Sequence, residues 1–389
     1  MDRRSFISGA GMLALTQLMA GCGGQNSAAL RVRLLKNSIP GPVLNQFRKS
    51  LDRGLVLDFK TEPQLQELFT QLQTWQQPQP KNSQTSFFSI SLPFFNSQES
   101  PSLPDLVSLG DFWLATAIKQ KLIEPLDLKN VPNWEKLPQR WRSLVTRNNN
   151  GEVDPKGQIW AAPYRWGTTL IAYRRDKLQS LGIKPLQDWA DLWQDELKEM
   201  ISLPNQAREV IGLTLKKLGE SYNTKELGEV KNLKAELQKL HRQVKLYSSG
   251  AYLQPLILGD TAVAVGWSTD ILPIVAQQQK ISAVIPQSGT SMWADLWVRP
   301  KGAPAEVNLR DSWIDFCWQP PIATQLSLRS KASSPVFAGL KSSEFPKNWQ
   351  SQPLLFPDAE IFKKSEFLLP LPDQTLQEYE KLWREIRLG

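Results

Sequence analysis

Residues 162–173 read APYRWGTTLIAY. Aromatic and β-branched residues are frequent on both sides of Trp166-Gly167, so the sequence predicts two strands, Ile159–Pro163 and Thr168–Tyr173. The aromatic–glycine pair between them predicts a break in the extended backbone, because glycine adopts conformations that other residues avoid. Such a break is consistent with a hinge between two halves of the molecule and equally with a β-bulge.

Strand-like segments continue in both directions and alternate with helical patterns. One helix is expected after Gly110, with Asp111 as its cap, and a long one around residues 226–245 has an apolar stripe at helical spacing. Strands that alternate with helices along a whole chain indicate an α/β protein with largely parallel sheets. The other predicted strands are Leu30–Leu35, Leu55–Phe59, Pro104–Gly110, Met200–Leu203, Thr261–Trp267, Ile281–Ile285 and Met292–Val298.

The composition excludes several classes of protein. The chain has 389 residues, of which 41% are hydrophobic, and this length suits two globular domains. The net charge of +8 is spread along the chain, which does not indicate nucleic-acid binding. With His241 as its single histidine and only two cysteines, Cys22 and Cys317, the sequence offers no His-based metal site, no four-Cys zinc site and no Ser-His-Asp triad. We expect no metal and no cofactor.

The first residues resemble an export signal. Arg3-Arg4 precedes a mildly apolar stretch that is shorter than the roughly 20 residues needed to span a membrane. Arg3-Arg4-Ser5-Phe6-Ile7 resembles the twin-arginine motif, and the small residues before Cys22 resemble a bacterial lipoprotein cleavage site. We predict that residues 1–21 are the signal, that Cys22 is lipidated and that residues 22–30 form a tether. An amphipathic N-terminal helix with an incidental cysteine is the alternative.

Residues 291–298 contain the first candidate binding site. On a strand, Trp293, Asp295 and Trp297 share one face, because successive side chains alternate between faces. A carboxylate between two indoles suits an amine or another cation, since the carboxylate pairs with the charge and an indole face adds cation–π attraction. In the alternative interpretation, both tryptophans belong to the core and Asp295 forms a salt bridge. This segment alone favours neither.

Two further segments carry candidate residues. Trp267 follows the small residues 264–266 at the predicted end of a strand, where open α/β sheets usually bind ligands. Glu209 lies in the first turn of a helix that follows Met200–Leu203, where the helix dipole favours a carboxylate for structural reasons alone. Taken singly, Trp267 could equally be a core residue and Glu209 a structural one.

The order of these segments resembles the periplasmic polyamine-binding proteins of ABC importers and, more broadly, the bacterial extracellular solute-binding proteins. The resemblance covers roughly residues 100–389, and its motifs are fairly specific together but not singly. They are Pro104–Gly110, Pro163–Gly167, the Trp-Ala-Asp-Leu-Trp of residues 189–193, the Ala-Arg-Glu-Val of residues 207–210, Gly266-Trp267 and Trp293–Asp295.

The resemblance implies a two-lobed α/β periplasmic-binding-protein fold. Each lobe would have a mixed, mostly parallel sheet flanked by helices, with the ligand cleft between the lobes and closure by a hinge. The predicted first lobe comprises residues 31–167 plus 294–340, and the second comprises residues 168–293 plus 341–389. Crossings between the lobes are expected near Trp166-Gly167, near Trp293-Ala294 and near residue 340.

The same resemblance implies a set of ligand-binding residues. Trp267 and Trp293 match the family's ligand-holding aromatics, Glu209 and Asp295 match its amine-pairing acids, and Phe112 stands where the family has a tyrosine. The sequence departs from the family at Gln206, which stands where a second acid is expected.

The sequence therefore predicts a non-enzymatic, lipid-anchored periplasmic protein that captures a small solute and delivers it to an ABC permease. A polyamine or another organic amine is the leading ligand. Two alternatives remain: a solute-binding scaffold that serves as an envelope interaction or sensor protein, and an exported glycoside hydrolase with Glu209 and Asp295 as its acid/base pair.

Overall fold

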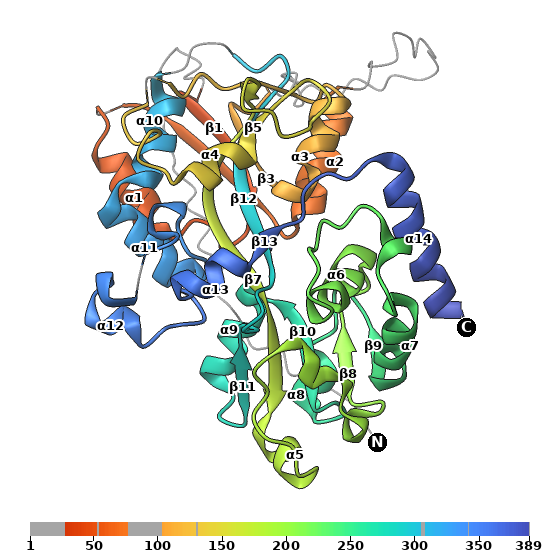
Figure 1. Ribbon diagram of the computed structural model, residues 1–389. Helices are drawn as coiled ribbons and strands as arrows, with labels where there is room; N and C mark the ends of the chain where they lie inside the picture. The colour runs from red at the N-terminus through yellow and green to blue at the C-terminus, as the bar shows by residue number, and fades with distance from the viewer. Residues whose placement is uncertain are drawn as a thin grey trace, which may run out of the picture.

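The computed structural model describes residues 28–388, apart from residues 53, 77–102, 130, 305–307 and 341. The predicted signal, Cys22 and most of the tether lie outside the described residues. The long strands β7 (Ala162–Arg174) and β12 (Ser291–Pro300) run through the middle of the molecule, with one group of elements above them and another below in Figure 1. We refer to these groups as the first and the second lobe.

The first lobe, at the top of Figure 1, contains β1 (Leu30–Leu35), α1 (Gly41–Lys49), β2 (Leu57–Glu62), α2 (Leu65–Trp75), β3 (Leu106–Gly110), α3 (Asp111–Lys119), β4 (Ile123–Glu124), α4 (Gln139–Val145), β5 (Thr146–Arg147), β6 (Gln158–Ile159), α10 (Asn308–Trp318) and α11 (Pro320–Ser330). The second lobe, at the bottom, contains α5 (Arg175–Ser180), β8 (Ile201–Leu203), α6 (Ala207–Lys217), α7 (Leu233–Gln243), β9 (Val244–Tyr247), α8 (Gln254–Leu258), β10 (Val263–Trp267), α9 (Ser268–Gln277) and β11 (Ile281–Val284). The last elements are α12 (Lys347–Gln350), α13 (Ala359–Lys364), β13 (Glu366–Phe367) and α14 (Asp373–Leu388), the last of which packs beside α6 and α7.

One mixed sheet connects the two lobes, with the strand order β2-β1-β3-β12-β7-β10-β8-β9. The first half of β7 pairs antiparallel with β12, and its second half pairs antiparallel with β10 and β11. Pairing is parallel between β1 and its neighbours and between β8 and its neighbours. The α/β class and the two-lobed architecture predicted from the sequence are therefore confirmed.

The predicted break at Trp166-Gly167 is wrong, because β7 is one continuous strand of 13 residues. An irregularity exists nearby: Asp295 of β12 pairs with Arg165, whereas Leu296 pairs with Pro163, so that Tyr164 is an extra residue. The β-bulge alternative thus holds for this strand, at Tyr164. The continuous strand results from pairing on both sides, which outweighs the conformational freedom of the glycine.

In the described part of the chain, the first lobe has one main hydrophobic core, and the second lobe has two, one on each side of β10. The core of the first lobe includes the ends of β12 and β7 nearest that lobe, and it also takes in Phe362 and Phe367 from the C-terminal segment. The larger core of the second lobe lies against β8 and β10. The tryptophans explain much of this packing, since six of those in the described residues are less than 2% exposed: Trp141, Trp166, Trp189, Trp297, Trp313 and Trp318.

The long helix expected over residues 226–245 is shorter. The helix α7 begins after Asn232, whose φ of 63° is left-handed, and residues 244–247 form β9 beside β8. Val244 and Tyr247 favour a strand, and pairing with β8 overrides the continuing helical pattern. Within the described ranges, no helix combines the length and apolarity that crossing a bilayer requires.

Candidate functional site

The candidate site lies where β7 and β12 cross between the lobes. Arg165 and Gly167 lie on one face of β7, because residues two apart on a strand point the same way. Their partners on β12 are Asp295 opposite Arg165 and Trp293 opposite Gly167. We call this surface the crossing face; its residues are Arg165, Gly167 and Thr169 of β7 and Ser291, Trp293 and Asp295 of β12.

Gly167 allows Trp293 to approach the backbone of β7. A β-carbon at Gly167 would lie 2.8 Å from Cε2 of Trp293 and would also collide with the hydroxyl of Ser268. The glycine is therefore required by space, with the indole of Trp293 lying directly over it. Trp293 is half-buried, so part of its indole remains open to solvent.

Trp267 reaches the crossing face from the other side of β7. It is the last residue of β10 and pairs with Thr169, and its side chain is half-buried. The hydroxyl of Tyr252 holds this strand end, because it accepts a hydrogen bond from the backbone N–H of Trp267 at 3.2 Å and donates one to Asp270 at 2.7 Å. The ring of Tyr252 also packs against Trp267 edge-on, with the ring centroids 6.0 Å apart.

Glu209 lies at the second-lobe end of the crossing face. It belongs to the first turn of α6, and its side chain is buried. Oε2 of Glu209 lies 2.6 Å from the hydroxyl of Ser291 and 3.4 Å from that of Thr169. Burial raises the pKa of the Glu209 carboxyl, and these hydroxyl contacts oppose the rise. The first-turn position alone would explain a carboxylate here, but these contacts also connect α6 to both crossing strands.

Asp295 lies at the first-lobe end and already has a cationic partner. Its Oδ2 is 2.6 Å from Nε of Arg165, and the side chains of both residues are almost completely buried. The guanidinium carbon of Arg165 lies 5.9 Å from the ring centroid of Trp293, within cation–π range. Burial raises the pKa of the Asp295 carboxyl, and the guanidinium of Arg165 opposes the rise. The structure thus has the salt bridge that the alternative interpretation of residues 291–298 required.

Asp111 adds a second buried carboxyl near this end. It is the first residue of α3, whose cap is Gly110, so the expected capping role of Asp111 is wrong. Its Oδ1 instead accepts a hydrogen bond of 2.9 Å from the backbone N–H of Ala294, which fixes α3 against β12. Burial raises the pKa of Asp111 to about 7, although the nearby Arg147 opposes the rise.

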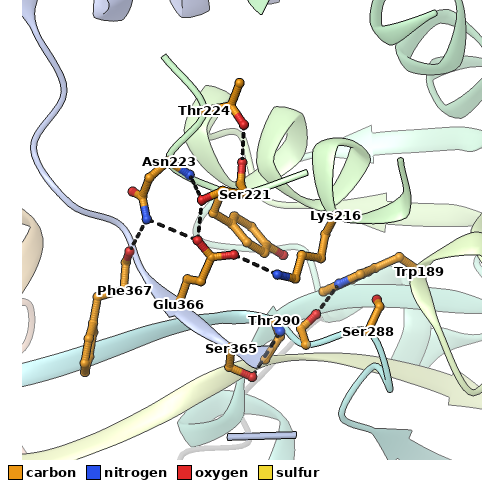
Figure 2. Close-up of polar contacts among 12 residues, drawn as sticks. Trp189, Lys216, Ser221, Asn223, Thr224, Ser288, Thr290, Ser365, Glu366 and Phe367 are labelled. Carbon is orange, nitrogen blue, oxygen red and sulfur yellow. Dashed lines mark hydrogen bonds and ion pairs between the residues drawn. The ribbon is translucent and has the colours of Figure 1, made fainter. Parts of the chain in front are cut away.

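Figure 2 shows how polar contacts attach the C-terminal segment to the second lobe. Glu366 of β13 pairs with Ser291 in the sheet register, next to the contact between Ser291 and Glu209. The carboxylate of Glu366 accepts hydrogen bonds from Nζ of Lys216, at 2.7 Å, and from the hydroxyl of Ser221. Both donors belong to α6 or to the loop after it, so this network attaches β13 to the second lobe.

The structure brings four of the five sequence-predicted residues to one place: Glu209, Trp267, Trp293 and Asp295. Phe112 lies in the first turn of α3, where its side chain is 61% exposed and packs edge-on against Trp113. Trp297, the other tryptophan of β12, is completely buried and stacks on Tyr164 in the core.

Sequence reasoning missed Arg165, Ser291 and Thr169. A signal for Arg165 was present, because it lies two residues before Gly167 and so shares its face on a strand. The predicted break at Gly167 concealed this periodicity. Ser291 and Thr169 carried no signal of their own, because their role depends on the register between two strands that are more than 100 residues apart.

Two hollows elsewhere on the described surface do not involve these residues. One, of about 510 Å³, lies between α9, β11 and residues 351–361, and the other, of about 410 Å³, lies between α7 and α14. Within the part of the chain that the structure describes, no group of three His, Cys, Asp or Glu side chains could hold a metal ion.

The sequence has clear relatives among binding proteins. The spermidine/putrescine-binding periplasmic protein of Salmonella typhimurium is 26% identical over 287 residues, which are 73% of this chain and 78% of that protein. The putrescine/cadaverine-binding protein of Pseudomonas aeruginosa is 28% identical over 243 residues, which are 60% of this chain and 68% of that protein.

A solved structure has the same fold. It is the spermidine/putrescine ABC transporter substrate-binding protein PotD from Streptococcus pneumoniae, with a TM-score of 0.74 and 20% identity, covering 93% of this chain and 99% of that one. Residues 102–365 match the sequence family described as bacterial extracellular solute-binding protein, whose members bind solutes and are not enzymes. The match covers more than half of the sequence, and the chain therefore belongs to the bacterial extracellular solute-binding proteins.

Proposed function

We propose that the protein captures a small organic amine between its two lobes and delivers it to the permease of an ABC importer. The observation that carries this proposal is the crossing face, which has Glu209 at one end, Asp295 at the other and two indoles between them. Carboxylates pair with ammonium groups, and indole faces attract cations and pack on methylene chains. The relatives from Salmonella and Pseudomonas are named for polyamines, so organic amines, polyamines among them, are the leading class of ligand.

Capture would proceed by closure of the lobes around β7 and β12. These strands contribute to both lobes, so a small change of twist at the crossing face would alter the separation of Trp267, in the second lobe, from Phe112, in the first. Closure would then bring the exposed ring of Phe112 toward Trp267, where the ligand would bind.

We further propose export and lipid anchoring through Cys22. The support comes from the sequence of residues 3–22, with its twin arginines, apolar stretch and small residues before the cysteine. In a bacterial host, the full-length protein should fractionate with the membrane, and Cys22→Ser should release it. Lys36→Ser, which leaves the signal untouched, is the control. Equal membrane association of all three proteins would contradict the anchor.

The experiment that tests the function is thermal unfolding of the full-length chain carrying Cys22→Ser with a panel of solutes. The panel contains putrescine, spermidine, spermine, amino acids, sugars and a buffer blank. A ligand at 100 times its Kd should stabilise the fold by about 2.7 kcal/mol and raise the midpoint by a few degrees. A shift with amines supports the proposal, and a shift only with a neutral solute contradicts the amine. No shift with any solute favours an envelope interaction or sensor role.

A further inference from the structure

The two carboxylates of the crossing face differ in what a ligand ammonium would find. Glu209 is contacted by hydroxyl groups, which can remain in place when a cation binds beside them. Asp295 is contacted by a full positive charge, the guanidinium of Arg165. Arg208, the neighbour of Glu209 on α6, favours the charged carboxylate from a distance, but its guanidinium donates to the backbone oxygens of Tyr222 and Leu369 and to Asn223. Among the described residues, Glu209 therefore has no direct ion pair, whereas Asp295 belongs to a neutralised one.

Arg165 makes both of the interactions that a bound ammonium would make at this end. Its Nε is 2.6 Å from the carboxylate of Asp295, and its guanidinium carbon is 5.9 Å from the ring centroid of Trp293. A carboxylate beside an indole face is the arrangement that recognises a cation. Here the protein itself supplies that cation, from a position on β7 directly opposite Asp295.

The other carboxyls near this end do not replace Asp295. Asp111 is buried and accepts a hydrogen bond from the backbone of Ala294. Asp270 accepts a hydrogen bond from the hydroxyl of Tyr252 and is exposed to solvent, where an ion pair with an ammonium contributes little. A second ammonium would also lie close to the guanidinium of Arg165, and two like charges in a site of low dielectric repel strongly. The site at this end is thus suited to a neutral group.

We propose that Arg165 occupies the place of a second ligand ammonium against Asp295, so that the site selects amines with one cationic end and a neutral remainder. The cationic end binds at Glu209, and the carbon chain lies along Trp293 and Trp267. The distance from Thr169 to Arg165 along β7 is about 13 Å, at about 3.3 Å per residue, which leaves room for a short chain. This inference rests on the proposed amine-binding function and makes Arg165 a residue that determines specificity.

The test compares butylamine, which has one ammonium group, with putrescine, which has two on the same four-carbon chain. Calorimetric titration of the full-length chain carrying Cys22→Ser should show butylamine binding at least about threefold more tightly than putrescine, because the second ammonium of putrescine is repelled by Arg165. Spermidine, with a third cationic group, should bind more weakly than either. A Kd for putrescine that is lower than that for butylamine, or within about threefold of it, would overturn the inference while leaving amine binding intact.

Substitution of Arg165 provides the second part of the test. Arg165→Met keeps a long side chain and removes the charge, so Asp295 becomes free to pair with a ligand. Putrescine should then bind at least about tenfold more tightly than butylamine, because a charge-assisted hydrogen bond is added. Arg165→Met combined with Asp295→Asn should abolish this preference. Arg174→Met, which removes another arginine of β7, one that pairs with Asp176 of α5, should not create it.

The outcomes separate the two proposals. If Arg165→Met folds and its preference equals that of the starting protein, the inference is wrong although the protein binds amines. If Arg165→Met does not fold, the ratio of the Kd values for butylamine and putrescine in the protein that retains Arg165 decides whether the inference holds. If the unmodified site binds neither amine, both the inference and the amine-binding function fail.

Discussion

The backbone of Gly167 lies directly beneath the indole of Trp293, so closely that a β-carbon at Gly167 would be 2.8 Å from Cε2. Both partners of this contact are on crossing strands, so neither can move away easily. Gly167→Ala should therefore displace Trp293, lower the free energy of unfolding by about 1–3 kcal/mol and weaken solute binding.

Urea unfolding and solute titration of Gly167→Ala measure both effects. Gly250→Ala is the control, because a β-carbon there would meet nothing within 4 Å. If Gly167→Ala is as stable as the control and binds solute equally well, Trp293 does not depend on this contact.

The buried pair of Arg165 and Asp295 leads to a second prediction. Removal of one partner leaves the other charge buried without compensation, so Asp295→Asn should lower the free energy of unfolding by about 3–5 kcal/mol. The double variant Arg165→Met/Asp295→Asn should lose much less than the sum of the single variants, because no unpaired charge remains. Urea unfolding of all three proteins gives the coupling energy.

An exposed ion pair provides the comparison for this cycle. Lys234 and Glu385 are 2.7 Å apart on α7 and α14, and both side chains are largely accessible to solvent. The coupling energy of this pair should be much smaller than that of Arg165 and Asp295, because solvent screens exposed charges. A coupling at Arg165 and Asp295 no greater than that would mean that their charges are solvated in solution.

Asp111 should make stability depend on pH. Its pKa is raised from 3.8 to about 7 in the folded protein, so between these values the unfolded chain is ionised and the folded protein holds the proton. As pH rises through this window, ionisation of Asp111 stabilises the unfolded state relative to the folded one. The free energy of unfolding therefore falls by at most about 4 kcal/mol and becomes constant above pH 7.

Asp111→Asn should remove this dependence, because its amide oxygen can still accept the hydrogen bond from Ala294. Urea unfolding near pH 5 and near pH 8 measures the effect, as the variant should be more stable than the parent only at the higher pH. Asp195→Asn, at an exposed position of the second lobe, is the control. Equal pH dependence of Asp111→Asn and the parent would show that another group titrates in this window.

The sequence allowed the architecture and most of the candidate site to be predicted. Alternation of strands with helices gave the α/β class, and the period of two on residues 291–298 correctly placed Trp293 and Asp295 on one face. The motif order led to Glu209 and Trp267, which the structure brings to the same place as Trp293. The lobe boundaries and the ligand-binding roles of these residues stay predictions.

The features that the sequence did not predict depend on pairing between segments that are far apart in the chain. Arg165 is near Asp295 only because β7 and β12 pair in one register, and that register includes the extra residue Tyr164. Gly167 predicts a break because a glycine between aromatic and β-branched residues gives the same local pattern in two cases. In one the chain bends, and in the other, as here, the glycine packs against an indole. Likewise, β9 forms only because β8 is available beside it. Local sequence patterns contain none of these relationships.

Trp267 gives the most direct test of ligand binding. Its indole is half-buried at the end of β10, and its backbone is held independently by Tyr252, so Trp267→Ala should leave the strand in place. Loss of the cation–π and packing contacts should weaken binding of an amine by at least about tenfold. Trp383→Ala is the matched control, because that indole is also half-buried but lies on α14, against Tyr247. Calorimetry should show reduced affinity only for Trp267→Ala, with similar unfolding midpoints for both variants. Undiminished affinity of Trp267→Ala would place the amine elsewhere on the protein.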